Sequence, residues 1–148
     1  MSAAVLPRPT FAEFLEGTVT WHSPLRVRVE HEAFRPVLET FAADLHASVG
    51  WSMDFVDTTE ACDLDVRLLP ELEGEQYQVA LASLSSIDAG TREGLYRALT
   101  TLRQLGPAQW WSKTTVEIES AELPCVVIQD GPSFAWRGVH LDVSRHFF

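Results

Sequence analysis

Residues 63–105 read DLDVRLLPELEGEQYQVALASLSSIDAGTREGLYRALTTLRQL, and this stretch decides the fold class. Its first seven residues alternate between apolar and charged side chains, which is typical of a strand with one packed face and one solvated face. Residues 76–81 and 84–89 are two further strand candidates. Leucines then recur at helical spacing from Thr91 to Leu105, where Gly106-Pro107 ends the helix. This order predicts an α+β fold: a mostly antiparallel sheet with its helices packed on one face.

The same two periodicities recur on either side of this stretch. Residues 17–21 and 25–30 are alternating and β-branched, which predicts two strands. From His31 to Ser48, apolar residues recur at spacings of three and four, which predicts a second helix that ends at Gly50. Three further strands are expected at 51–57, 114–120 and 125–130.

The composition is that of one globular domain. Of the 148 residues, 46% are hydrophobic and 22% are charged, which excludes a disordered tail. The formal net charge of −10 would repel the phosphates of nucleic acid and of an anionic membrane. No apolar run approaches the ~18 residues of a membrane-spanning helix. We therefore expect neither nucleic acid nor a membrane among the partners.

The chain start and the cysteine content predict a cytoplasmic protein. The first ten residues, MSAAVLPRPT, lack both the basic region and the apolar region of a signal peptide. Two cysteines, Cys62 and Cys125, are too few for a disulfide framework. We expect both to be buried thiols.

Residues 31–35, HEAFR, resemble the start of a zinc-protease helix, in which two histidines four residues apart bind the metal. The second histidine is replaced here by Arg35, which cannot coordinate zinc. We therefore expect a polar helix start and no metal. The sequence also contains no glycine-rich phosphate loop and no nucleophile elbow, so we expect no cofactor.

Two other groups of residues have alternative readings. Trp110 and Trp111 could stack on a sugar, but adjacent residues of a strand face opposite ways; one buried ring and one exposed ring are favoured. Four acids could pair as acid and base, but they lie on or beside alternating strands, where a solvated face is the simpler interpretation: Asp54, Asp57, Asp63 and Asp65. We find no catalytic constellation in the first 130 residues.

The last residues are different, because WRGVHLDVSRHFF (136–148) closely resembles the opening of the catalytic barrel in glycoside hydrolase family 20, the β-N-acetylhexosaminidases. An Asp-x-Pro-x-Phe-x-Trp-Arg-Gly lead-in is present from Asp130 to Gly138. Upstream, residues 76–105 are similar to the non-catalytic domain that precedes the barrel in that family. The matching positions there are Tyr77, Gly94, Leu95, Tyr96, Thr101, Leu102, Gln104 and Leu105.

The resemblance implies two parts. Residues 1–130 would form the non-catalytic domain, which is similar in fold to zinc proteases, and residues 131–148 would form the lead-in and first strand of a truncated (β/α)₈ barrel. Such a barrel needs about 250 residues. The orphan strand is expected to dock onto the domain or to pair with another copy through residues 134–148, because its partners are absent.

The resemblance also implies a function. Family members cleave terminal β-linked N-acetylglucosamine or N-acetylgalactosamine with retention, and the acetamido group of the substrate acts as the nucleophile. Their catalytic Asp-Glu pair lies later in the barrel, beyond Phe148, so this chain alone is expected to be inactive. Its partners would be its own missing barrel and, in the parent enzyme, N-acetylhexosamine-containing glycans.

One residue of the family's sugar site matches this chain. Arg137 corresponds to the arginine that binds the hydroxyls of the terminal sugar. Sites in such barrels lie at the C-terminal ends of the strands. By that rule, Asp142, Arg145 and His146 are the expected site residues instead. These three could equally form a polar cluster that supports the barrel mouth. Two alternatives to an enzyme fragment stay open. One is a free-standing carbohydrate-binding module, indicated by the five tryptophans, and the other is a purely structural accessory domain.

Overall fold

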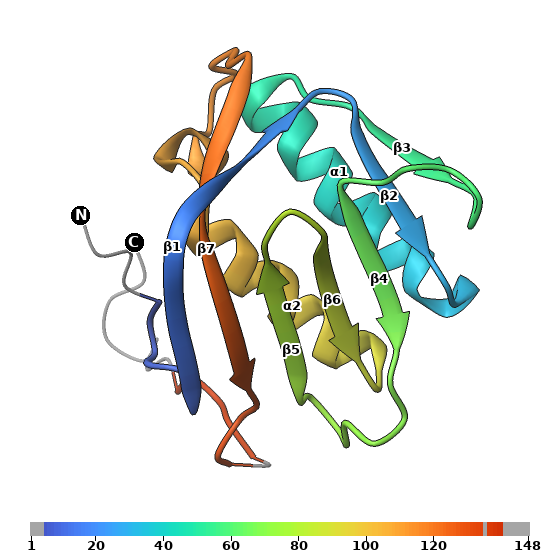
Figure 1. The fold of residues 1–148 in the computed structure, drawn as a ribbon. Coiled ribbons are helices and arrows are strands. Elements are labelled where there is room, and N and C mark those ends of the chain that lie inside the picture. The colour runs from blue at the N-terminus through green and yellow to red at the C-terminus, as the bar shows by residue number, and fades with distance from the viewer. Residues whose placement is uncertain (1–4, 135, 141–148) are drawn as a thin grey trace, which may run out of the picture.

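The computed structural model describes residues 5–134 and 136–140. Within this part, a seven-stranded sheet carries two α-helices on one of its faces (Figure 1). The strands are β1 (Phe11–His22), β2 (Leu25–Val29), β3 (Met53–Val56), β4 (Leu64–Leu68), β5 (Tyr77–Leu81), β6 (Ser85–Ala89) and β7 (Ser120–Asp130). The helices are α1 (Arg35–Val49) and α2 (Arg92–Leu105), and two 3₁₀ turns span Glu32–Phe34 and Ala108–Trp111.

The sheet is mixed, with the order β1-β7-β5-β6-β4-β2-β3. Its β1, β7, β5 and β6 strands pair antiparallel, whereas β6, β4, β2 and β3 pair parallel. The predicted α+β class is confirmed, but the sheet is less antiparallel than the sequence suggested. The reason is the connection through α1, which returns the chain so that β3 runs in the same direction as β2, as a parallel pair requires.

The core lies between the sheet and the helices. Alternate residues of the inner strands face it, so Val27, Val66 and Val79 are completely buried. Trp110 lies at one end of this core, stacked on Trp21 with ring centroids 6.5 Å apart. Phe41 and Trp51 meet the same ring edge-on, at 6.3 and 6.1 Å. Four aromatic rings from distant parts of the chain therefore hold β1, α1 and the segment after α2 together.

The ends of both helices follow the sequence signals. Gly50 adopts the left-handed conformation that ends α1, with φ = 75°. Thr91 precedes α2, and its hydroxyl accepts a hydrogen bond from the backbone N–H of Gly94 at 3.1 Å. Gly106 follows α2 directly and lies against Trp110; a Cβ at this glycine would be 2.2 Å from that ring.

Two predicted strands differ from the structure. Residues 114–119 were expected in a strand, but they lie outside the helices and strands. This segment instead runs along the end of α1, where the Val116 N–H donates to the Ser48 carbonyl at 2.8 Å and the Trp51 indole N–H donates to the Ile118 carbonyl at 2.8 Å. Strand β1 begins at Phe11, six residues before the predicted start. Its first half is exposed, so the alternation that marks a half-buried strand is absent there.

The open face of the sheet, opposite the helices, is polar and its charges are paired. Arg67 on β4 donates two hydrogen bonds to the Asp88 carboxylate on β6, at 2.7 and 2.8 Å.

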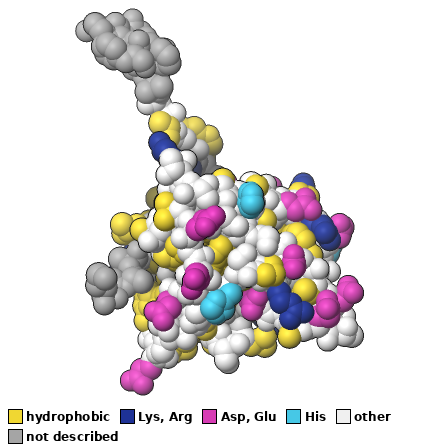
Figure 2. Space-filling view, turned by 90° about the horizontal axis from the view of Figure 1, so that it is seen from above, with side chains coloured by type: hydrophobic (Ala, Val, Ile, Leu, Met, Phe, Trp, Pro, Cys, Tyr) yellow, Lys and Arg dark blue, Asp and Glu magenta, His cyan; other side chains and the backbone are white. Residues whose placement is uncertain are grey.

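Acidic side chains predominate over basic ones on the side of the molecule shown in Figure 2, in keeping with the net charge of −10. No α-helix in the described part of the chain is long and apolar enough to cross a membrane.

Candidate functional site at the end of strand β7

The point where the chain leaves the sheet is tied down by Asp130, the last residue of β7. Its Oδ1 accepts hydrogen bonds from the backbone N–H and the hydroxyl of Thr10, both at 3.0 Å. Its Oδ2 accepts a hydrogen bond from the Tyr77 hydroxyl at 3.3 Å, and that hydroxyl lies 2.6 Å from the Thr101 hydroxyl on α2. One carboxylate therefore connects the beginning of β1, the beginning of β5 and the end of β7.

Tyr77 is held in its neutral form at this joint. Burial is the largest cause that raises the pKa of its hydroxyl to about 12, and the adjacent Asp130 carboxylate acts in the same direction. A neutral phenol keeps its proton to donate, so the hydrogen bond to Asp130 persists across the physiological pH range.

Beyond Asp130, the chain lies beside α2. A cavity of about 360 Å³ is lined by Phe134 and Arg137 on one side and by Arg97 and Thr100 of α2 on the other. The segment after β7 is therefore on the helix side of the molecule.

Arg137, the predicted sugar-binding residue, contacts the domain itself. Its guanidinium donates to the Glu75 carboxylate and to the Phe134 carbonyl. Glu75 also accepts from Arg97 Nε at 2.6 Å. The hydrogen bond from Arg137 is the main cause that lowers the pKa of Glu75, and the one from Arg97 is the second. Asp142, Arg145 and His146, the other predicted site residues, lie outside the described residues.

The segment that holds Arg137 is not in a strand. Residues 136–140 lie outside the helices and strands, and the rest of the expected barrel strand lies outside the described residues. Within the described part of this segment, Phe134, Trp136 and Val139 are 74%, 87% and 97% exposed, so these three side chains are not buried against the domain. The other residues that were expected to dock or to pair with another copy lie outside the described residues, so that expectation stays a prediction.

The other candidate residues have structural roles. His31 Nδ1 accepts a hydrogen bond from the Ala33 N–H at 3.2 Å, which caps the first 3₁₀ turn. Arg35 pairs with Glu39 at 3.2 Å. In the part of the chain that the structure describes, no three His, Cys, Asp or Glu side chains lie together as a metal site.

The tryptophan interpretation favoured from the sequence is confirmed, and the solvated acidic face is confirmed only for Asp54 and Asp57, which are exposed, whereas Asp63 and Asp65 are half-buried. Trp110 is completely buried and Trp111 is 50% exposed, although they lie on a 3₁₀ turn and not on a strand. Asp63 accepts a hydrogen bond from the Arg26 backbone N–H at 2.8 Å, and Asp65 lies 3.7 Å from Arg28. These acids support the sheet. Cys62 and Cys125 are free and half-buried, where full burial was expected.

A groove on the outer side of the helix layer, between α1 and α2, was not predicted from the sequence. Tyr96 of α2 and Trp111 both line this groove between α1 and α2, and both rings are about half exposed. Arg103 covers the Trp111 ring at 4.5 Å from its centroid and pairs with Asp44 of α1 at 2.8 Å. Tyr96 and Trp111 are 15 residues apart in sequence, so only the turn after α2 brings them together.

The fold and this site define an α+β domain whose chain exit is anchored by Asp130 on the helix side. The comparisons with known proteins identify its family. Residues 2–131 match the family description "Glycosyl hydrolase family 20, domain 2". The chain belongs to glycoside hydrolase family 20, as the resemblance in its sequence predicted.

Relatives with known sequences or structures agree. A β-N-acetylhexosaminidase of Cellulomonas fimi is 32% identical over 152 aligned positions, which cover 98% of this chain and 29% of that protein. An N-acetyl-β-hexosaminidase of Streptomyces plicatus, solved in complex with Thio-NAglucal, superposes with a TM-score of 0.83 at 26% identity, covering 97% of this chain and 29% of that one. The β-N-acetylhexosaminidase of Streptomyces coelicolor superposes with a TM-score of 0.83 at 27% sequence identity, again covering 97% of this chain and 29% of that one. The chain thus spans less than a third of the length of these relatives.

Proposed function

We propose that this chain is the accessory domain of a retaining β-N-acetylhexosaminidase and that it supports a catalytic barrel without carrying the acid and the orienting carboxylate. The observation that carries the proposal is the Asp130 joint. It fixes where the chain leaves the sheet, at the boundary where the family match ends.

The outer face of the helix layer is the surface that we assign to the barrel. The chain leaves β7 on that side, where Phe134 lines a cavity together with Thr100 of α2. Tyr96 and Trp111 present half-exposed aromatic rings on the same layer. Aromatic rings with a polar tip are common at the centres of protein interfaces.

A domain exchange tests this assignment. The second domain of the Cellulomonas fimi relative would be replaced by residues 2–131 of this chain. We expect the chimera to hydrolyse an aryl N-acetyl-β-glucosaminide, whereas this chain alone gives no turnover, because it lacks the groups that stabilise the transition state.

Two aspartate substitutions on the helix face make the test specific. The double variant Tyr96→Asp/Trp111→Asp should lower the melting temperature and the activity of the chimera, and it should lower the melting temperature of the chimera by more than that of the isolated chain, in which Trp111 already contacts Arg103. Leu84→Asp is the matched control, because Leu84 is equally apolar and 65% exposed but lies in the β5–β6 turn. Equal effects of the control and the double variant would refute the proposed face.

The alternative of a free-standing carbohydrate-binding module through the tryptophans has less support. Three of the five, Trp21, Trp51 and Trp110, are buried in the core, which leaves Trp111 and Trp136 as the exposed rings. A sugar cannot reach the buried rings without unfolding the domain.

A further inference from the structure

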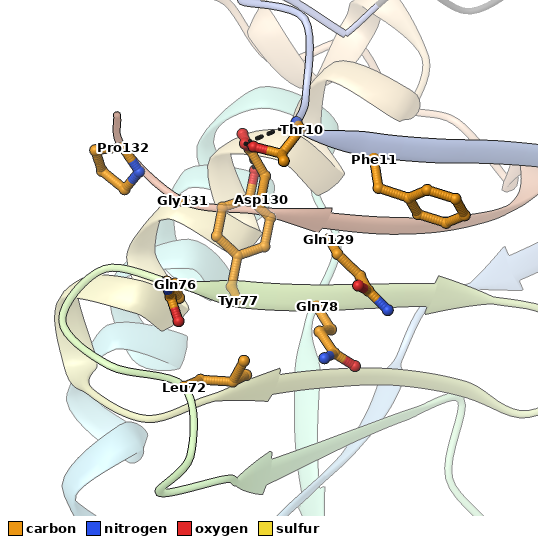
Figure 3. Close-up of a pocket in the computed structure, with 10 residues that line it drawn as sticks. All are labelled: Thr10, Phe11, Leu72, Gln76, Tyr77, Gln78, Gln129, Asp130, Gly131 and Pro132. Carbon is orange, nitrogen blue, oxygen red and sulfur yellow. Dashed lines mark hydrogen bonds between the residues drawn. The ribbon is translucent and has the colours of Figure 1, made fainter. Parts of the chain in front are cut away.

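A second cavity, of about 280 Å³, opens at the beginning of β5 and the end of β7, on the face of the sheet opposite the helices (Figure 3). Its floor is a row of one aromatic and two amide side chains from neighbouring strands: Phe11 on β1 is the register partner of Gln129 on β7, which is the partner of Gln78 on β5. Neighbouring strands lie ~4.8 Å apart, so the row spans roughly 10 Å.

These side chains face away from the core. Gln78 lies between Tyr77 and Val79, which are both buried against the helices, so strand alternation directs Gln78 to the open face. Gln129 alternates in the same way with the buried Ile128. The Phe11 ring is 44% exposed beside them.

The two glutamines present their side-chain amides at the cavity. Gln78 and Gln129 both line it, and each amide offers one carbonyl oxygen and two N–H donors. Gln76, at the rim, uses its carbonyl to accept from the Glu73 N–H at 3.2 Å. Three amides around one cavity favour a ligand that both donates and accepts.

Apart from Asp130, the described residues that line the cavity are uncharged. Leu72 forms an apolar side. Gly131 lies so near to Gln76 that a Cβ at the glycine would be 2.8 Å from Gln76 Cγ. Asp130 is the only charged residue of the lining, and Thr10 and Tyr77 engage its carboxylate. A neutral ligand is therefore favoured over an ion.

We propose that this cavity binds a pyranose unit of a neutral N-acetylated glycan. Sugar hydroxyls donate and accept, as the glutamine amides do, and an acetamido group offers one donor and one acceptor that a carboxamide can match in a reciprocal pair. The C–H face of a pyranose ring suits the electron-rich face of Phe11. The volume of about 280 Å³ is just below the range of about 300–1,000 Å³ for ligand pockets, which suits a single sugar ring better than a larger ligand.

This inference goes beyond the proposed accessory role, because it places a sugar on the sheet face, away from the helix face assigned to the barrel. Its success or failure is independent of the domain exchange: a chain that supports no barrel could still bind sugar here, and the reverse also holds.

The test measures binding of chitobiose to the whole 148-residue chain, with saturation-transfer NMR and calorimetry as the two readouts. We expect a millimolar dissociation constant and weaker binding of cellobiose, which lacks the acetamido groups. The double variant Gln78→Ala/Gln129→Ala should bind chitobiose about tenfold more weakly, because it loses hydrogen bonds worth about 0.5–1.5 kcal/mol each. Gln109→Ala, at an exposed glutamine on the second 3₁₀ turn, is the matched control and should bind as the wild type does.

Phe11→Ala should also weaken binding, and thermal melts establish that each variant is folded. Both glutamines lie at a solvent-accessible face, so the double variant remains a fair test if Phe11→Ala does not fold. The proposal is overturned if the wild type shows no saturable binding of chitobiose, if the double variant binds as tightly as Gln109→Ala, or if cellobiose binds as tightly as chitobiose.

Discussion

The tryptophans of the core, which precede Asp130 in the sequence, and Trp136, which follows it, differ in how much of each side chain is exposed. Before Asp130, Trp21, Trp51 and Trp110 are 0–3% exposed. After it, Trp136 is 87% exposed. The tryptophans of the core are therefore all in place by the end of β7, and the exposed Trp136 ring adds nothing to that core.

The largest effect expected from this difference is at the tryptophans themselves. Trp110→Ala removes a ring that packs on three others and should lower the free energy of unfolding by about 3–5 kcal/mol. Trp136→Ala should change it by less than about 0.5 kcal/mol. Urea unfolding followed by far-UV circular dichroism measures both, and a comparable loss in the two variants would remove the distinction between the regions.

Two glycine substitutions test the same difference between the two regions, with smaller expected changes in the free energy of unfolding. A Cβ at Gly106 would clash with the Trp110 ring, so Gly106→Ala should cost about 1–3 kcal/mol of unfolding free energy. At Gly138, a Cβ would meet the Trp136 ring at an ordinary contact distance of 3.7 Å. Gly138→Ala should therefore leave the urea midpoint unchanged, and a destabilised Gly138→Ala would show that residues 136–140 are packed in solution.

The sequence predicted most of this architecture because burial leaves a periodic pattern. Both helices and the strands β2 to β6 were found from alternation or from helical spacing. Strand β1 was recognised only in part, since its exposed half, with Glu13 and Glu16, lacks that pattern. Residues 114–119 alternate like a strand but have no strand to pair with, and no local signal reports the absence of a partner.

The site was less predictable than the fold. The lead-in motif drew attention to Asp130, but its partners Thr10 and Tyr77 are 120 and 53 residues away. Only the completed sheet brings them together. Parallel pairing was missed for a similar reason, because it depends on where α1 returns the chain and not on the composition of any one strand.

The hydrogen bonds around Asp130, where the two regions meet, predict that Tyr77→Phe lowers the free energy of unfolding. Loss of the hydroxyl removes hydrogen bonding to Asp130 and Thr101 and should cost about 1 kcal/mol at neutral pH. The pKa of Tyr77 is raised from 10.0 to about 12 on folding, so the unfolded chain ionises first as pH rises. Between pH 10 and about 12 the wild type should therefore lose stability relative to Tyr77→Phe. If the difference between the two stays constant over this window in urea titrations, the buried neutral phenol is refuted.

The smallest effect expected is at the exposed contact between Glu75 and Arg137. Arg137 is the main cause that lowers the pKa of the Glu75 carboxyl, so Arg137→Ala should raise that pKa towards its usual value. Arg97 continues to lower it in the variant. NMR titration of the Glu75 side chain measures the change. An unaltered pKa would indicate that the segment after β7 does not contact the domain in solution.

The central claim is that the domain is complete without the residues that follow its last strand, and a shortened chain tests it most directly. A variant that ends at Ser133 keeps the Asp130 joint and removes every residue from Phe134 onwards. We predict that its free energy of unfolding equals that of the whole chain within error, and that it is at least as monomeric in size-exclusion chromatography. A loss of about 1.5–3 kcal/mol, the value of one fully buried large side chain, would show that the removed residues belong to the core and would contradict the claim.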